Sequence, residues 1–178
     1  MKTKKIVTGA VIAALYTALC LALPALSYGT VQVRFSEALT LLPVLLPGGL
    51  MGVTLGCFLT NLVGVFLGTN ILGALDVLFG TLATLLACVV TYKLRNVRFK
   101  GLAIVPSLPP VLFNAVIIGI EIAVMFPDPS SSAPLWLACI TNGISVGIGE
   151  LISCTVLGVL LVKIVETNTS LRKVFLEA

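Results

Sequence analysis

Long apolar runs, separated by short polar connections, dominate the hydrophobic pattern of this chain. A helix needs about 20 apolar residues to cross the hydrocarbon core of a bilayer. Runs of this order cover residues 6–26, 50–67, 71–94, 102–126 and 133–165. A shorter apolar piece, residues 38–46, is interrupted by Pro43 and ends at Pro47. We predict that it continues from Ser36 and Glu37 as a half-buried helix, and that the chain is an all-α integral membrane protein of six transmembrane helices.

Two further features shape this prediction. Residues 27–35 are polar and strand-prone, so they are expected to form the first connection. The last apolar run is long for one span, and Gly143, Gly147 and Gly149 offer places to bend. Splitting it would give seven spans, but no loop residue marks a break. Residues 1–178 are therefore interpreted as a single transmembrane domain.

The basic residues orient the bundle. They gather at the N-terminus, between the fourth and fifth spans, and in the C-terminal tail: Lys2, Lys4, Lys5; Lys93, Arg95, Arg98, Lys100; Lys163, Arg172, Lys173. Positive residues favour the cytoplasmic side. Six crossings with both termini cytoplasmic put all three clusters there, whereas an odd number would put one on the wrong side. The protein is therefore predicted to be a multi-pass protein of the cell membrane.

Composition excludes several classes of function. Only 10% of residues are charged and 58% are hydrophobic, with a mean hydropathy of +1.17, which is too apolar for a soluble domain. The basic residues lack aromatic interleaving, so no nucleic-acid partner is expected. There is no histidine, no phosphate-binding G-x-x-x-x-G-K-[ST] motif and no C-x-x-C pair among the five cysteines. We expect no enzyme activity, no cofactor and no metal site.

Four acidic side chains fall within this apolar sequence: Glu37, Asp76, Glu121 and Glu150. A carboxylate inside a span costs on the order of 2.5 kcal/mol or more unless it faces protein or water. The predicted orientation puts these acids, together with Asn114 and Asn142, in the outer half of the bundle. Asn114 and Glu121 are seven residues apart and share a helix face. The pattern predicts a pocket that opens outward.

The charges of this region indicate its ligand. Arg34 supplies one positive charge against the four acids, so the pocket favours a cation or a ligand rich in hydrogen-bond donors. A carboxylate accepts two parallel N–H bonds, the geometry of a guanine-like edge. Trp136 and Tyr28, near the outer face, are candidates for stacking on a planar ring.

Structural roles remain open for the same residues. Arg34 and Glu37 could instead form an ion pair with each other at the membrane interface. Asp76 is alternatively an acid that favours the helix dipole, and Trp136 an interfacial anchor. Glu121 alternatively reaches outer water, and Glu150 bridges helices.

The first helix carries a stripe of small residues. Ala10, Ala14 and Ala18 recur every four residues, a spacing that allows another helix to approach closely. The same spacing occurs at Gly52 and Gly56 and at Gly143 and Gly147. Internal packing is the alternative interpretation.

Four segments in order resemble the queuosine-precursor transporter family, the substrate-binding subunits of energy-coupling-factor (ECF) importers. They are residues 31–39 (VQVRFSEAL), 76–85 (DVLFGTLATL), 114–119 (NAVIIG) with Glu121, and 147–151 (GIGEL). The resemblance implies a six-helix subunit without ATPase activity, in a complex with a transmembrane coupling protein and two ATP-binding subunits. It implies that Ala10, Ala14 and Ala18 contact the coupling protein, and that residues 28–35 close over the ligand.

The implied ligand is a 7-deazaguanine, such as 7-cyano- or 7-aminomethyl-7-deazaguanine, or queuine. We predict that Glu121 and Glu150 bind its edge, supported by Asn114 and Asn142, and that Asp76 and Arg34 lie at the gate or rim. The alternatives are a subunit for a pterin, a flavin or a thiamine-like vitamin, a carboxylate-lined channel, and a membrane-embedded enzyme.

Overall fold

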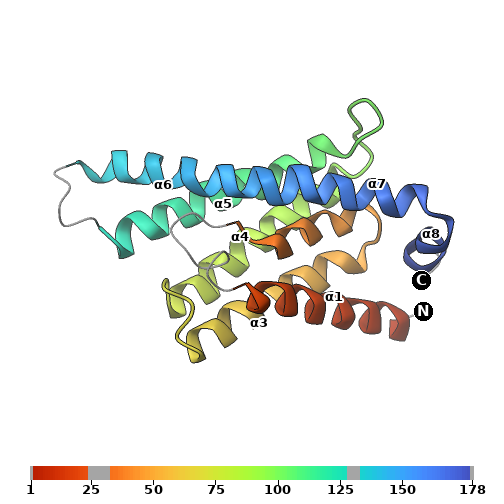
Figure 1. Cartoon of the computed structure of the whole chain (residues 1–178), viewed down its shortest axis with the longest axis horizontal. Helices are drawn as coiled ribbons and strands as arrows, with labels where there is room; N and C mark the ends of the chain where they lie inside the picture. The colour runs from red at the N-terminus through yellow and green to blue at the C-terminus, as the bar shows by residue number, and fades with distance from the viewer. Residues whose placement is uncertain (1, 24–32, 128–132, 177–178) are drawn as a thin grey trace.

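Helices make up nearly all of the described chain. The computed structural model describes residues 2–23, 33–127 and 133–176. The elements, shown in Figure 1, are α1 (Lys2–Ala22), the 3-10 helix η1 (Phe35–Val44), α3 (Gly48–Phe66), α4 (Ala74–Lys93), α5 (Ile104–Met125), α6 (Leu135–Glu150), the π-helix η2 (Leu151–Gly158), α7 (Val159–Thr167) and α8 (Thr169–Leu176). The predicted loop at residues 28–35 falls mostly outside the described residues, as does most of the connection at 127–134.

Five helical stretches in the described part of the chain are long and apolar enough to cross a membrane. They are Lys5–Ala22, Gly48–Phe66, Ala74–Lys93, Ile104–Met125 and Leu135–Thr167. Each matches a predicted span to within a few residues at most ends. The all-α membrane bundle is thus confirmed, whereas a count of six crossings depends on how the short helix η1 is assigned.

The last span is one continuous rod, with no interruption between Leu135 and Thr167. Figure 1 shows α6, η2 and α7 following one another along a single axis. The seven-span alternative required a break here. The middle of this continuous helix is a π-helical segment, which begins directly after Glu150.

Helix η1 lies in the middle of the bundle. It contacts α1, α3, α4, α5, η2 and α7, so most of the other helices pack around it. Pro43 lacks an N–H donor and lies inside this helix, and Pro47 precedes α3. The predicted helix is present at nearly the predicted residues, but it is mostly buried instead of half-buried. It carries Ser36, Glu37 and Thr40 into the interior.

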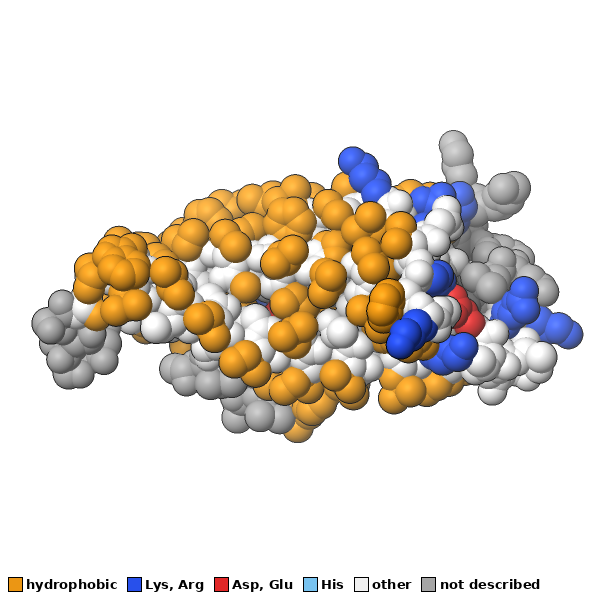
Figure 2. All heavy atoms as spheres, turned by 90° about the horizontal axis from the view of Figure 1, so that it is seen from above, with side chains coloured by type: hydrophobic (Ala, Val, Ile, Leu, Met, Phe, Trp, Pro, Cys, Tyr) orange, Lys and Arg blue, Asp and Glu red, His pale blue; other side chains and the backbone are white. Residues whose placement is uncertain are grey.

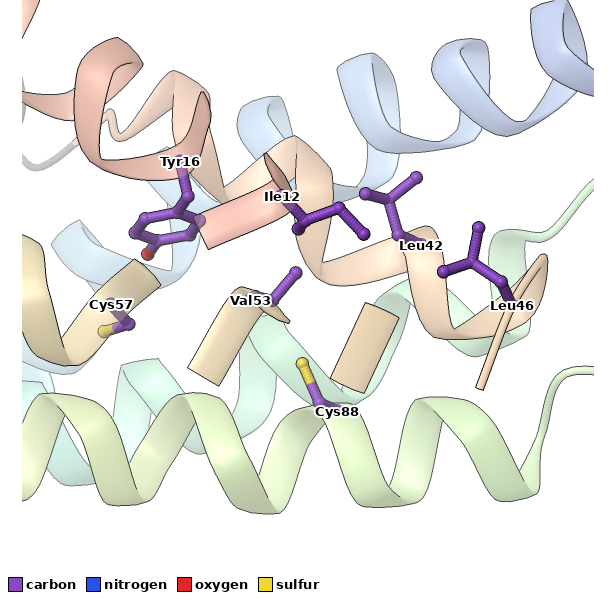
Figure 3. Packing of buried hydrophobic residues seen from close by; sticks show 7 residues of the cluster. All are labelled: Ile12, Tyr16, Leu42, Leu46, Val53, Cys57 and Cys88. Carbon is purple, nitrogen blue, oxygen red and sulfur yellow. The ribbon is translucent and has the colours of Figure 1, made fainter. Parts of the chain in front are cut away.

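An apolar cluster surrounds the C-terminal part of η1 and the residues just after it (Figure 3). Leu42 and Leu46 pack with Ile12 and Tyr16 of α1, with Val53 and Cys57 of α3, and with Cys88 of α4. All seven side chains are buried. This cluster holds η1 between α1, α3 and α4, and so fixes where the polar first turn of η1 can lie.

Two of the predicted small-residue patterns are used in internal packing. A Cβ added at Gly56 would lie 2.7 Å from Cβ of Tyr16, and one at Gly52 would lie 2.8 Å from the carbonyl oxygen of Gly9. A Cβ at Gly119 would lie 2.6 Å from Cα of Gly143. Helices α1 and α3, and helices α5 and α6, therefore approach closely only because these positions lack side chains.

The two termini lie at the same end of the bundle, and the turn between α4 and α5 lies toward that end as well (Figure 1). Figure 2 shows Lys and Arg side chains gathered at this end, whereas apolar side chains cover most of the rest of the visible face. One ion pair here joins Arg98 to Glu166 at 2.6 Å. This gathering of basic side chains at one end agrees with both termini on the same side of the membrane. The assignment of that side to the cytoplasm stays a prediction.

Candidate functional site

Two carboxyl groups meet in the interior of the bundle. Glu37 comes from the first turn of η1 and Glu150 from the last residue of α6, and they are 1% and 4% exposed. One oxygen of each, together with the sulfur of Cys154, lies within 4.8 Å of the others. Burying two like-charged groups this close is unfavourable, so an acid pair of this kind calls for a functional reason.

The hydrogen bonds to this acid pair come from neutral donors in the described part of the chain. The hydroxyl of Tyr16 donates to Glu37 Oε1. The amide of Asn114 donates to Glu150 Oε1 at 3.0 Å, and the thiol of Cys154 lies 3.1 Å from Glu150 Oε2. Glu37 Oε2 has no hydrogen-bond partner among the described residues. The pair therefore retains capacity to accept hydrogen bonds from a ligand.

The π-helix η2 positions one side of this site. π-Helical turns are rare and occur often at functional sites. Here the segment starts at Leu151 and carries both Ser153 and Cys154, which are buried. Cys154 also lies 3.4 Å from the backbone carbonyl of Glu37, so η2 and η1 are joined beside the two acids. This local geometry fixes the position of Glu150 relative to Glu37.

A second polar cluster forms around Asp76. Nη2 of Arg34 lies 3.2 Å from Asp76 Oδ2, and the Asn70 amide donates to the same oxygen at 2.8 Å. The Asn61 amide donates to the Asp76 backbone carbonyl at 2.9 Å. Gly80 makes room for this arrangement, since a Cβ there would collide with Asp76 Oδ1.

This cluster decides between two of the alternatives that the sequence left open. Arg34 forms its ion pair with Asp76, and Glu37 bonds to Tyr16 instead. Asp76 is in the first turn of α4, yet its side chain is 0% exposed and is held by Arg34 and Asn70. It therefore serves as the buried counter-ion of Arg34 and not simply as an acid at a helix end.

Glu121 lies apart from the acid pair. It lines a groove of about 390 Å³ between α4 and α5, with otherwise apolar walls. No described hydrogen bond or ion pair joins Glu121 to Glu37 or Glu150. The structure thus brings Glu150 and Asn114 together as predicted, but the acid beside them is Glu37.

Comparison with protein families gives one match that covers most of the chain. The model of the QueT transporter family matches residues 6–167. The chain belongs to the QueT transporter family. No curated protein and no solved structure matches it. The family is one of membrane transporters and not of enzymes, and membership makes the protein a multi-pass cell-membrane transporter of the queuosine-precursor class.

The remaining predicted residues of this QueT transporter lie outside the two clusters. Asn142 is half-buried, and Trp136 is 63% exposed in the first turn of α6. No described hydrogen bond joins either of them to the acids. Ala10, Ala14 and Ala18 are all exposed along α1, in contrast to the buried glycines of α3. Tyr28 lies outside the described residues.

Sequence reasoning missed three side chains that shape the site of this QueT transporter. Tyr16 occupies the same face of α1 as Ile12 and Cys20, so a phenol at that spacing within an apolar run was a usable signal. Cys154 follows Glu150 by four residues, which predicts a shared face. Asn70 lies in the turn before α4, and nothing in its sequence context indicated a bond to Asp76.

Proposed function

We propose that this protein is the substrate-binding subunit of an ECF-type importer and binds a 7-deazaguanine from outside the cell. The observation that carries the proposal is the buried pair of Glu37 and Glu150, which is hydrogen-bonded by neutral donors and retains free acceptor capacity. Family membership supplies the transport class. The acid pair supports a nitrogen-rich ligand, because its carboxylates can accept N–H hydrogen bonds.

The chemistry of the ligand fits such a pair. The edge of a 7-deazaguanine offers N–H groups in parallel, and a carboxylate accepts two parallel N–H bonds. In an environment shielded from water, each bond to a charged acceptor contributes more than it would at a surface. A 7-aminomethyl substituent adds a positive charge, which two facing acids favour.

We assign the roles accordingly. Glu37 and Glu150 bind the donors of the base, with Asn114 and Tyr16 holding the two carboxyl groups in place. Arg34 and Asp76 form the rim of the site. Glu37 thereby takes the role that the sequence suggested for Glu121. Asn142 and Trp136 remain candidates for contacts on the outer side.

Ligand binding tests this proposal directly. The detergent-purified chain is titrated by calorimetry with 7-aminomethyl-7-deazaguanine, 7-cyano-7-deazaguanine and queuine, and with guanine, a pterin, riboflavin and thiamine for comparison. We expect at least one deazaguanine to bind more tightly than every comparison compound. If a pterin, riboflavin or thiamine bound most tightly, the substrate would be that vitamin and not a deazaguanine. If the chain alone conducted ions in liposomes, it would be a channel and not an importer subunit.

The exposed alanines of α1 support a partner subunit on that helix. Ala10, Ala14 and Ala18 leave a shallow face on which a helix of the coupling protein could pack. We expect Ala14→Trp to abolish uptake of deazaguanine by proteoliposomes that contain the coupling protein and two ATP-binding subunits, while binding to the isolated chain stays unchanged. Uptake assays and titrations on the same variant separate the two effects.

The matched control is Leu112→Trp, which adds the same side chain at a position of α5 that is 63% exposed. This variant should transport normally. Equal uptake by both variants would exclude the α1 face as the site of coupling, without affecting the assignment of the ligand site.

A further inference from the structure

The groove that contains Glu121 has the features of a second binding site. It lies between α4 and α5 and has a volume of about 390 Å³, within the range of small-ligand pockets. Its walls are apolar side chains from the two helices: Leu75, Phe79, Leu82, Ile117, Ile120, Val124 and Met125. Glu121 supplies the one acidic group in this lining.

Glu121 has no hydrogen-bond partner within the described residues. Its side chain is 6% exposed, and both carboxylate oxygens are buried and unbonded. No ion pair joins Glu121 to a basic residue in the described part of the chain, and Arg34 is paired with Asp76. A buried carboxyl group without a partner is costly, so a donor from another molecule would stabilise it.

The position of the groove indicates where that donor comes from. Several wall residues, including Phe79, Leu82 and Val124, are 37% to 55% exposed on helices that span the membrane, so the groove faces lipid. Glu121 is four residues before the end of α5, or about 6 Å along the axis. That end points away from both termini (Figure 1). The acid thus lies near the depth of lipid headgroups, with the apolar wall extending deeper.

We propose that this groove binds a phospholipid with a primary ammonium headgroup, of the phosphatidylethanolamine class. With the Glu121 side chain turned toward the groove, the ammonium donates to its carboxylate, and an acyl chain lies along the apolar wall formed by Phe79, Leu82 and Ile117. A primary ammonium has three N–H donors, whereas the trimethylated headgroup of phosphatidylcholine has none. The site is separate from the deazaguanine pair and does not depend on its assignment.

Native mass spectrometry of the purified chain tests this site. The chain is incubated with phosphatidylethanolamine and phosphatidylcholine of identical acyl chains, at equal concentration. We expect the ethanolamine adduct to exceed the choline adduct by about tenfold, the ratio that one charge-assisted hydrogen bond supplies. In Glu121→Gln the ratio should fall close to one.

Two further variants make the result decisive. Glu166→Gln removes an acid that is 31% exposed and paired with Arg98, and it should keep the preference. Val124→Phe fills the groove at a position that is 55% exposed, and it should reduce both adducts. Each variant is first shown to be monodisperse by gel filtration.

Three results would overturn the proposal. They are equal adducts in the unaltered chain, a preference that survives Glu121→Gln, and a Val124→Phe variant that binds both lipids normally. If Glu121→Gln instead weakens deazaguanine binding and leaves the lipid ratio unchanged, the groove belongs to the transport site and not to lipid.

Discussion

Replacing Glu150 by Gln is expected to weaken deazaguanine binding by at least about tenfold, which corresponds to about 1.4 kcal/mol of binding free energy. Glu150 is 4% exposed and already accepts bonds from Asn114 and Cys154, so its position is fixed before a ligand arrives. Gln keeps the shape of the side chain, but it replaces one acceptor oxygen by a donor that faces the donors of the base. Calorimetric titration of the purified variant measures the loss.

Stability distinguishes a binding role from a structural one. Two buried acids close together disfavour folding, so removing one charge should leave the thermal unfolding midpoint unchanged or raise it. Reduced affinity together with retained stability is therefore the expected signature at Glu150. Glu166→Gln, at a half-buried acid of α7 that is paired with Arg98, provides the control: it should leave the affinity unchanged and cost about 1 kcal/mol of stability or less. Unchanged affinity in Glu150→Gln would remove the acid pair from the binding site.

The spans of this protein could be predicted from the sequence because length and hydropathy determine them. Each long apolar run became a helix, and Pro43 and Pro47 indicated that the piece between the first two long runs would be short. What could not be predicted was the central position of η1. That position follows from packing against six other elements, which no local pattern encodes.

The positions of the candidate site residues in the fold could be predicted only in part, for a similar reason. Helix periodicity correctly placed Asn114 and Glu121 on buried positions of α5. Seven residues nearly restore the face of a helix, but they also move about 10 Å along it. Over that distance the neighbouring helix changes, so Asn114 contacts Glu150 whereas Glu121 lines the groove toward α4.

The π-helix after Glu150 had no usable sequence signal. The glycines at 143, 147 and 149 suggested a bend before this residue, but Gly143 instead allows close packing of α6 against α5. The widened turns begin only at Leu151. Because a π-helical turn shifts the register of all following side chains, the contact between Cys154 and Glu150 depends on tertiary packing as well as on their spacing.

Breaking the buried ion pair between Arg34 and Asp76 is expected to have the largest effect on stability. Arg34→Met should lower the free energy of unfolding by about 3–5 kcal/mol, because it leaves a carboxylate that is 0% exposed without its cation. Asn70 still donates one bond to Asp76, which offsets only part of the loss. Unfolding in mixed micelles with increasing SDS measures the change.

A double-mutant cycle attributes this cost to the pair. Asp76→Asn alone should also destabilise, since it removes the carboxylate that faces the buried guanidinium of Arg34, whereas the double variant should lose less than the sum of the two single changes. The half-buried pair of Arg98 and Glu166, whose side chains are 28% and 31% exposed, is the matched control. Arg98→Met there should cost about 1 kcal/mol or less. Additive losses at Arg34 and Asp76, of the same size as at Arg98, would mean that the buried pair does not hold η1 against α4.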